Sequence, residues 1–136
     1  MARLWAMTVE FDNVAVGDTL PVLIKWETED TILRYNSLHG EADENDEYPD
    51  TLPQKTVESY VVELLGKGFP PARLDAEDSR VDVEHLLPVV ANDTISLSGI
   101  VTGKQTAEEL RLVQCAVAVD NDRGQPVARA TAVISL

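Results

Sequence analysis

The chain has 136 residues, which is enough for one domain with a buried core. Hydrophobic residues make up 44% and charged residues 26%, a composition typical of globular proteins rather than of disordered ones. With 24 acidic and 11 basic side chains, the formal net charge is −13. A charge of this sign repels nucleic-acid phosphates and anionic membrane surfaces, so we expect neither as a partner.

Segments for export or membrane insertion are not predicted. The apolar stretches are too short to span a bilayer, and residues 1–7 lack the long apolar core of a signal peptide. The single cysteine, Cys115, excludes an intrachain disulfide, and the apolar run around it predicts a small, buried hydrophobic side chain. We therefore expect one domain over residues 1–136 and a cytoplasmic location.

Residues 20–26 predict the first strand, after a turn-rich opening segment. Val22, Ile24 and Trp26 lie on one side of this segment, an alternation that favours β structure. Thr28 then provides a suitable N-cap for a short helix, because its hydroxyl can accept a hydrogen bond from the first turn.

A second and more apolar helix is predicted over residues 56–65. Between the two helices, Gly40 is a stop signal, and residues 41–50, six of them acidic, predict a loop. The apolar side chains of the second helix recur at helical spacing, and Gly66 and Gly68 follow them. We expect the sheet to wrap around this helix.

The second half of the chain predicts strands joined by short connections. Residues 120–125 indicate a hairpin turn in which Gly124 supplies the positive φ. Short connections favour an antiparallel meander over crossover units, so the fold class expected is α+β. The segments with β-branched or alternating apolar residues are 80–86, 94–101, 110–119 and 127–136.

Four short sequence segments, spread along the whole chain, carry a family resemblance. Residues 11–18 contain an aromatic followed by a Val-Gly-Asp turn, residues 28–40 form the predicted first helix, and residues 123–130 the last hairpin. Together with residues 83–94 they resemble the MaoC-like (R)-specific enoyl-CoA hydratases. The F-x-x-P-V-x-x-G-D stretch of that family matches with His in place of Phe and Asn in place of Gly. The resemblance implies a single hotdog domain, a curved antiparallel β-sheet wrapped around a central α-helix.

The catalytic segment departs from the family pattern. After the first helix the family has Gly-Asp-x-Asn-Pro-x-His, in which the Asp and His form the hydration dyad. This chain keeps Gly40 but has Glu41 in the Asp position, Asp43 in the Asn position, Glu44 in the Pro position and Asp46 in the His position. Water addition needs an acid and a base with different pKa values, and repulsion among these carboxylates would favour keeping one of them protonated.

The remaining site residues are also assigned from the resemblance. The family opens its central helix with a His-Gly pair whose backbone amide polarises the thioester carbonyl; Pro53-Gln54 stand there, and the Gln54 amide can still donate. His39 would supply an imidazole, or would instead act as a cation at the end of the first helix. The expected site has Glu41, His39 and Asp46 as catalytic residues and Gln54 and Asp43 at the substrate, with no metal.

Three functions are compatible with this sequence. The first is a hydratase or dehydratase that acts on an acyl thioester carried by coenzyme A or acyl carrier protein, with no further cofactor. The second is a non-catalytic subunit that pairs with a complete MaoC-like chain. The third is a hotdog acyl-CoA thioesterase that uses Glu58 or Glu63 on the central helix.

Pairing and carrier binding are further expectations. The resemblance implies a homodimer or a heteromer with another hotdog chain, and exposed sheet edges favour such pairing. Basic side chains available for a coenzyme A phosphate are Lys55, Lys67, Arg73 and Arg80.

Overall fold

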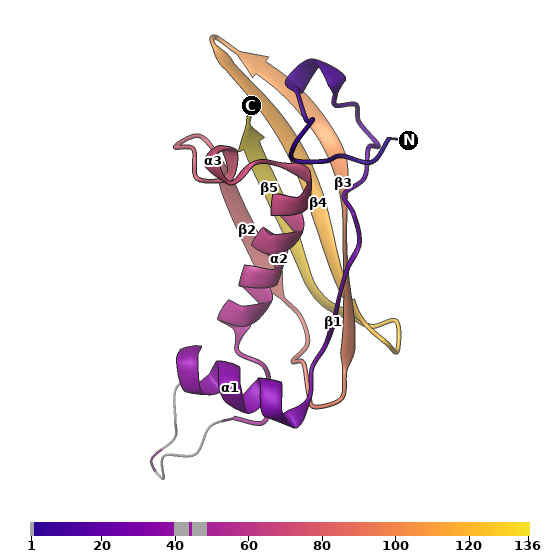
Figure 1. Ribbon diagram of the computed structural model, residues 1–136, viewed down its shortest axis with the longest axis vertical. Helices are drawn as coiled ribbons and strands as arrows, with labels where there is room; N and C mark the ends of the chain where they lie inside the picture. Colours follow the sequence, from indigo (N-terminus) through magenta and orange to yellow (C-terminus); the bar gives the residue numbers. More distant parts are fainter. Residues whose placement is uncertain (1, 40–43, 45–48) are drawn as a thin grey trace.

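One antiparallel sheet of five strands organises the chain (Figure 1). The computed structural model describes residues 2–39, 44 and 49–136. The strands lie in the order β1-β3-β4-β5-β2, and every neighbouring pair is antiparallel. Their bounds are Leu23–Trp26 for β1, Arg80–His85 for β2, Thr94–Ala107 for β3, Leu110–Asn121 for β4 and Pro126–Ser135 for β5.

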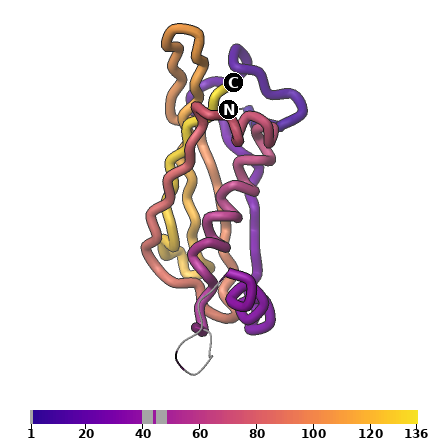
Figure 2. Tube along the Cα trace, turned by 90° about the vertical axis from the view of Figure 1, so that its left-hand side faces the viewer, coloured from indigo at the N-terminus to yellow at the C-terminus, as the bar shows by residue number. Residues whose placement is uncertain are grey.

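The longest helix, α2, spans Gln54–Gly68 and packs on the concave face of the sheet. Figure 2 shows the two layers from the side, with the sheet curving past the helix. The expected α+β layout, a curved antiparallel sheet around a central helix, is therefore confirmed. The other helical segments are the 3-10 turn Phe11–Asn13, α1 at Glu29–His39 and the short α3 at Pro71–Leu74. None of the helices in the described ranges is long and apolar enough to cross a membrane.

The core forms where the apolar side of α2 meets alternate residues of the strands. Val61, Leu64 and Leu65 of the helix are fully buried, as their spacing predicted. On the long strands, buried and more exposed residues alternate, as expected for a sheet with one face on the core. The burial of these side chains from both layers is the main force that holds the helix in the sheet.

Helix α1 begins where the sequence predicted. Thr28 Oγ1 accepts a hydrogen bond from the backbone N–H of Thr31, at 3.1 Å. In return Thr31 Oγ1 accepts one from the N–H of Thr28, at 2.8 Å. This reciprocal cap satisfies two backbone donors at the start of the helix and fixes its direction.

The position of β2 differs from the predicted meander. Only β3, β4 and β5 follow one another in both sequence and space, whereas β2 lies at the far edge, paired with β5. The place beside β3 is taken by β1. Residues 86–93 therefore cross the sheet from the β2 edge to β3, past the N-terminal end of α2.

Helix α2 also continues past the predicted stop, and Gly66 and Gly68 are both helical. The reason for glycine at 68 is close packing, because a Cβ there would lie 2.1 Å from Cδ2 of Leu20. The helix ends at Gly68, and the N–H of the next residue, Phe69, still bonds to the carbonyl of Leu65.

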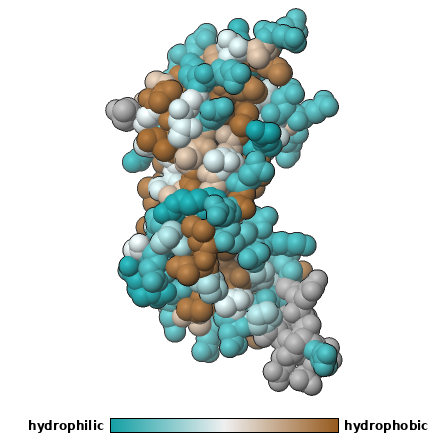
Figure 3. Space-filling view, turned by 180° about the vertical axis from the view of Figure 1, so that it is seen from behind, coloured by the Kyte–Doolittle hydropathy of each residue, from teal (hydrophilic) through white to brown (hydrophobic). Residues whose placement is uncertain are grey.

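One apolar side of β1 faces solvent rather than the core. Val22, Ile24 and Trp26 are 58%, 64% and 65% exposed, while the intervening Leu23 is buried. These three exposed residues lie on the sheet face turned away from α2, a face on which apolar patches interrupt the hydrophilic surface (Figure 3). The alternation predicted the strand correctly but did not show which side meets the core.

Candidate functional site

The N-terminal turn of α2 is held in place by hydrogen bonds from α1 and from the segment after β2. The buried side-chain amide of Asn36 donates to the carbonyls of Pro49 and Thr51, at 3.1 and 2.7 Å. Leu52 N donates to the carbonyl of Val89 at 2.9 Å, next to a bridge between Thr51 and Val90. The strand-like residues that lead into the helix are therefore fixed on both sides.

A cavity of about 210 Å³ opens at this turn. Gln54, the first residue of α2, lines it, and the backbone amides of Gln54 and Lys55 have no hydrogen-bond partner among the described residues. Free amides at a helix N-terminus carry the positive end of the helix dipole and can bind an oxygen that becomes negative. The other lining residues are Thr51, Leu52, Val57, His85, Leu86, Leu87, Pro88 and Val89.

An imidazole and a carboxylate meet beside the cavity. His85, the last residue of β2, has its Nε2 2.9 Å from Oε2 of Glu58 on α2. The side chain of His85 is 18% exposed and that of Glu58 is 48% exposed, so the pair lies at the surface with the imidazole more enclosed. Such a pair can orient an imidazole and move protons.

The residues expected at the site are only partly brought together. Gln54 lines the cavity, and His39 is the exposed last residue of α1. Glu41, Asp43 and Asp46 lie outside the described residues, so their roles stay predictions.

The two glutamates considered for thioester hydrolysis differ in their surroundings. Glu58 bonds to His85, not to Gln54, among the described residues. Glu63 forms an ion pair with Lys25 at 3.0 Å and faces the β1 side of the helix. Only Glu58 therefore lies next to the cavity at the helix N-terminus.

His85 is a functional candidate to which sequence reasoning gave no role beyond its place at the Phe position of the family stretch. The sequence did contain one signal. Val81 and Val83 precede His85 on the same face of β2, so the alternation predicts an apolar side chain at position 85, and a histidine breaks this pattern. The presence of Glu58 beside it was not predictable, because the two residues are far apart in the chain.

A second polar cluster lies deeper, between α1, α2 and the end of β1. Glu27 is 1% exposed, and its carboxylate accepts hydrogen bonds from the hydroxyls of Tyr60 and Thr31, at 2.5 and 2.8 Å. Burial, and then the bond to Glu27, raises the pKa of Tyr60 well above its ordinary value. With both oxygens bonded and no cavity among those described reaching it, the cluster has a structural role.

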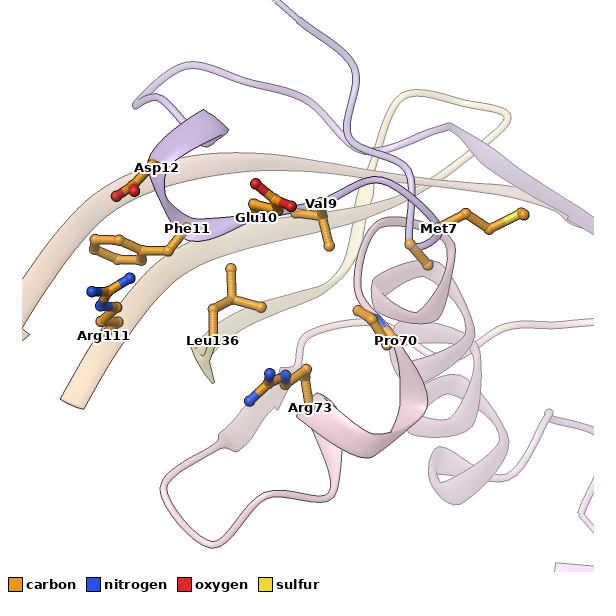
Figure 4. Close-up of a pocket in the computed structure, with 10 residues that line it drawn as sticks. Met7, Val9, Glu10, Phe11, Asp12, Pro70, Arg73, Arg111 and Leu136 are labelled. Carbon is orange, nitrogen blue, oxygen red and sulfur yellow. The ribbon is translucent and has the colours of Figure 1, made fainter. Parts of the chain in front are cut away.

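A larger cavity, about 430 Å³, lies beyond the opposite end of α2 (Figure 4). Arg73 of α3 and Arg111 of β4 approach it from either side of Leu136. Glu10 and Asp12 also line it, so cations and anions are balanced. A phosphate needs an excess of positive charge, so this cavity is not assigned to a coenzyme A phosphate.

Cys115 is buried, as predicted. Burial raises the pKa of its thiol to about 12, which keeps it protonated and unreactive near neutral pH. Among the residues that the structure describes, no group of three or more His, Cys, Asp or Glu side chains is placed to hold a metal ion.

Sequence comparison finds no matching family model and no matching curated protein. Solved structures do match over nearly the whole chain. The MaoC-like dehydratase from Rhodospirillum rubrum has a TM-score of 0.72 at 16% identity, covering 95% of this chain and 97% of that one.

Two further structures are similar. The (R)-hydratase from A. caviae involved in PHA biosynthesis has a TM-score of 0.67 at 17% identity, with coverage of 91% and 98%. The ChsH1-ChsH2 complex from Mycobacterium tuberculosis has a TM-score of 0.66 at 18% identity, with coverage of 90% and 98%. At these identities the likeness establishes the fold and does not transfer an activity. The chain therefore has the hotdog fold that MaoC-like dehydratases and (R)-hydratases share, as the family resemblance of its sequence predicted.

Proposed function

We propose that this chain binds an acyl thioester with the carbonyl at the first turn of α2, and that it adds water to, or removes water from, the acyl chain. The observation that carries the proposal is the cavity at this turn, which is lined by Gln54 at the helix start, where the described residues provide no partner for the backbone amides. Similar structures described as a MaoC-like dehydratase and an (R)-hydratase support the reaction class.

The helix end suits the chemistry of water addition to a 2-enoyl thioester. When hydroxide adds to the β-carbon, an electron pair moves through the α-carbon onto the thioester oxygen. A donor already directed at this oxygen stabilises the charge as it develops. The Gln54 amide and the dipole of the long helix α2 would provide that stabilisation, while Leu52, Val57 and Leu86 offer apolar walls to the acyl group.

The family resemblance offers one assignment of the residues that move protons. On the family resemblance, Glu41 is the leading carboxylate, His39 or Asp46 assists it, and Asp43 contacts the substrate. Replacing Glu41 with Gln should then abolish hydration of crotonyl-CoA, and an unchanged rate would remove this residue from the mechanism.

The alternative is a subunit that shapes the site of a second hotdog chain. It is favoured by the replaced Asp and His of the family motif and by the similar ChsH1-ChsH2 structure, which is a complex of two chains. The sheet has its edges at β1 and β2, and an exposed edge offers backbone groups to another strand. Copurification with a second hotdog chain, with activity only in the complex, would decide for this alternative; a competent homodimer would decide against it.

The decisive experiment compares Gln54→Pro with Gln54→Ala in hydration of crotonyl-CoA and a longer 2-enoyl-CoA. Proline removes the backbone N–H together with the glutamine side chain, whereas alanine removes the side chain alone. The chain accepts proline at a helix start, because Pro70, with φ −62° and ψ 146°, precedes Pro71 at the start of α3, and Pro53 has nearly the same φ of −58° and ψ of 141°. The amide is retained in the alanine variant.

We expect Gln54→Pro to lose about 100-fold in kcat and Gln54→Ala to stay near the wild type. Equal rates in the two variants would contradict a role for this amide. Release of free thiol without loss of the double bond would indicate hydrolysis, and with it the thioesterase.

A further inference from the structure

The pairing of His85 with Glu58 places an imidazole at the cavity where the proposed function places the thioester. The two residues belong to different layers of the fold, one at the end of β2 and the other on the second turn of α2. Their side chains are joined by an Nε2–Oε2 contact of 2.9 Å. Glu58 follows Gln54 by one helical turn, so the carboxylate stands above the amides at the helix start.

From this arrangement we infer that His85, in place of the carboxylates that the family resemblance assigns, is the proton-transferring group of this site and that Glu58 is its positioning residue. The inference rests on the proposed function, since it assumes an acyl thioester in the cavity. His85 and Gln54 line that cavity together, so β2 and α2 each contribute one residue to it.

The alternative role for the pair is to fasten β2 to α2, and the chain offers reasons against it. A surface contact with a half-exposed carboxylate contributes little to stability. Val81 and Val83 occupy the preceding positions on the same face of β2, and both are apolar. A histidine in that place is better explained by its chemistry.

The chemical step balances with this chain's residues and water alone. Glu58 Oε2 accepts the hydrogen of His85 Nε2, which leaves a lone pair on Nδ1. Nδ1 takes a proton from water, the hydroxide bonds to the β-carbon, and the double-bond electrons move onto the thioester oxygen beside the Gln54 amide. The imidazolium then returns a proton to the α-carbon as the carbonyl re-forms, so that one water has been added and the imidazole is regenerated.

The chain contains two histidines, His39 and His85, which makes a direct test possible. The imidazole proton resonances are assigned with His39→Gln and His85→Gln and followed while butyryl-CoA, which has no double bond to hydrate, is added. We expect the His85 resonances to shift. Movement of the His39 resonances alone would overturn the inference.

Activity provides a second readout. Hydration of crotonyl-CoA by His85→Gln should fall about 100-fold in kcat with KM changed less than about threefold, because general acid-base catalysis is worth this much. Glu84→Gln is the matched control, since it changes a neighbouring carboxylate on the exposed face of the same strand. A wild-type rate in folded His85→Gln would overturn the inference.

Glu58 is tested by comparing Glu58→Ala with Glu58→Gln. The glutamine oxygen still accepts from Nε2–H, so the glutamine variant should keep a higher kcat than the alanine variant, with KM unchanged in both. A merely structural contact would lower the melting temperature and leave kcat per folded molecule unchanged, which would contradict the positioning role.

The two proposals fail in different ways. If butyryl-CoA raises the melting temperature but leaves the His85 resonances unmoved, binding stands and this inference falls. If butyryl-CoA changes neither, the proposed function falls and the inference falls with it.

Discussion

The hydroxyl of Tyr60 donates a hydrogen bond of 2.5 Å to Oε1 of Glu27, which joins the middle of α2 to the residue that follows β1. Because Glu27 is 1% exposed, its carboxylate depends on protein donors in place of water. Thr31 provides the other bond, at 2.8 Å, from the first turn of α1. The two helices and the sheet edge are thus connected through one buried acid.

Replacing Tyr60 with Phe should destabilise the fold by about 1–3 kcal/mol, because a buried carboxylate oxygen loses its donor while the ring is kept. The measurement is the free energy of unfolding from denaturant titration. Val62→Ala, a half-exposed position on the same helix, is the control and should cost much less. Equal effects of the two changes would contradict the role of the bond.

The raised pKa of Tyr60 predicts a loss of stability at alkaline pH. An unfolded tyrosine ionises near pH 10, while burial and the Glu27 carboxylate keep Tyr60 protonated in the folded protein. The stabilisation is therefore complete below about pH 10 and falls as the pH rises above it. The free energy of unfolding should decline less steeply there in Tyr60→Phe than in the wild type, and parallel curves would contradict this assignment.

Leu20 separates α2 from β3 and accounts for glycine at 68 and 99. A Cβ at Gly68 would lie 2.1 Å from Leu20 Cδ2, and one at Gly99 would lie 2.5 Å from Cδ1, so Leu20 cannot move away from one without approaching the other. Gly99→Ala should therefore cost about 1–3 kcal/mol. In a Leu20→Ala background the cost should largely disappear, and a double-mutant cycle without coupling would contradict the steric explanation.

Cys115 should resist alkylation in the folded protein. Its side chain is buried and its pKa is raised to about 12, so both access and the reactive thiolate are suppressed. Mass spectrometry after iodoacetamide treatment at pH 8 should show little modification without denaturant and complete modification above the unfolding midpoint. Fast reaction in native buffer would indicate that β4 opens locally.

The facing of β1 can be tested by substituting adjacent residues. Leu23→Ala should cost about 2–4 kcal/mol because it removes buried apolar volume. Ile24→Thr, on the exposed side, should change the free energy of unfolding by about 0.5 kcal/mol or less in an isolated chain. A large loss in Ile24→Thr would show that this side of the strand is covered in solution.

Local patterns predicted most of the fold. The spacing of Val57, Val61 and Leu64 predicted the central helix, and the turn around Gly124, which has φ +74°, predicted the last hairpin. These features depend on nearby residues. Patterns in the sequence did not predict that β2 pairs with β5, since pairing between distant strands is decided by which edge remains available when the sheet assembles.

The candidate site was less accessible to sequence reasoning. Gln54 was placed at the start of the helix by the family strings, and it lines the cavity. His85 and Glu58 each had an ordinary explanation when considered alone, as a strand residue and as a solvated helix residue. Their chemistry arises from a contact between the helix layer and the sheet layer, and the spacing of residues in the sequence does not predict this contact.

The edge position of β2 has a consequence for how the protein is made. During synthesis from the N-terminus, β2 leaves the ribosome long before β5, its only pairing partner among the described strands. The cavity wall at residues 85–89 follows β2 directly, so its β2 end is not held by the sheet until the last strand arrives. Non-local pairing of this kind is slow, so a chain that stalls in translation before residue 126 should lack the complete cavity.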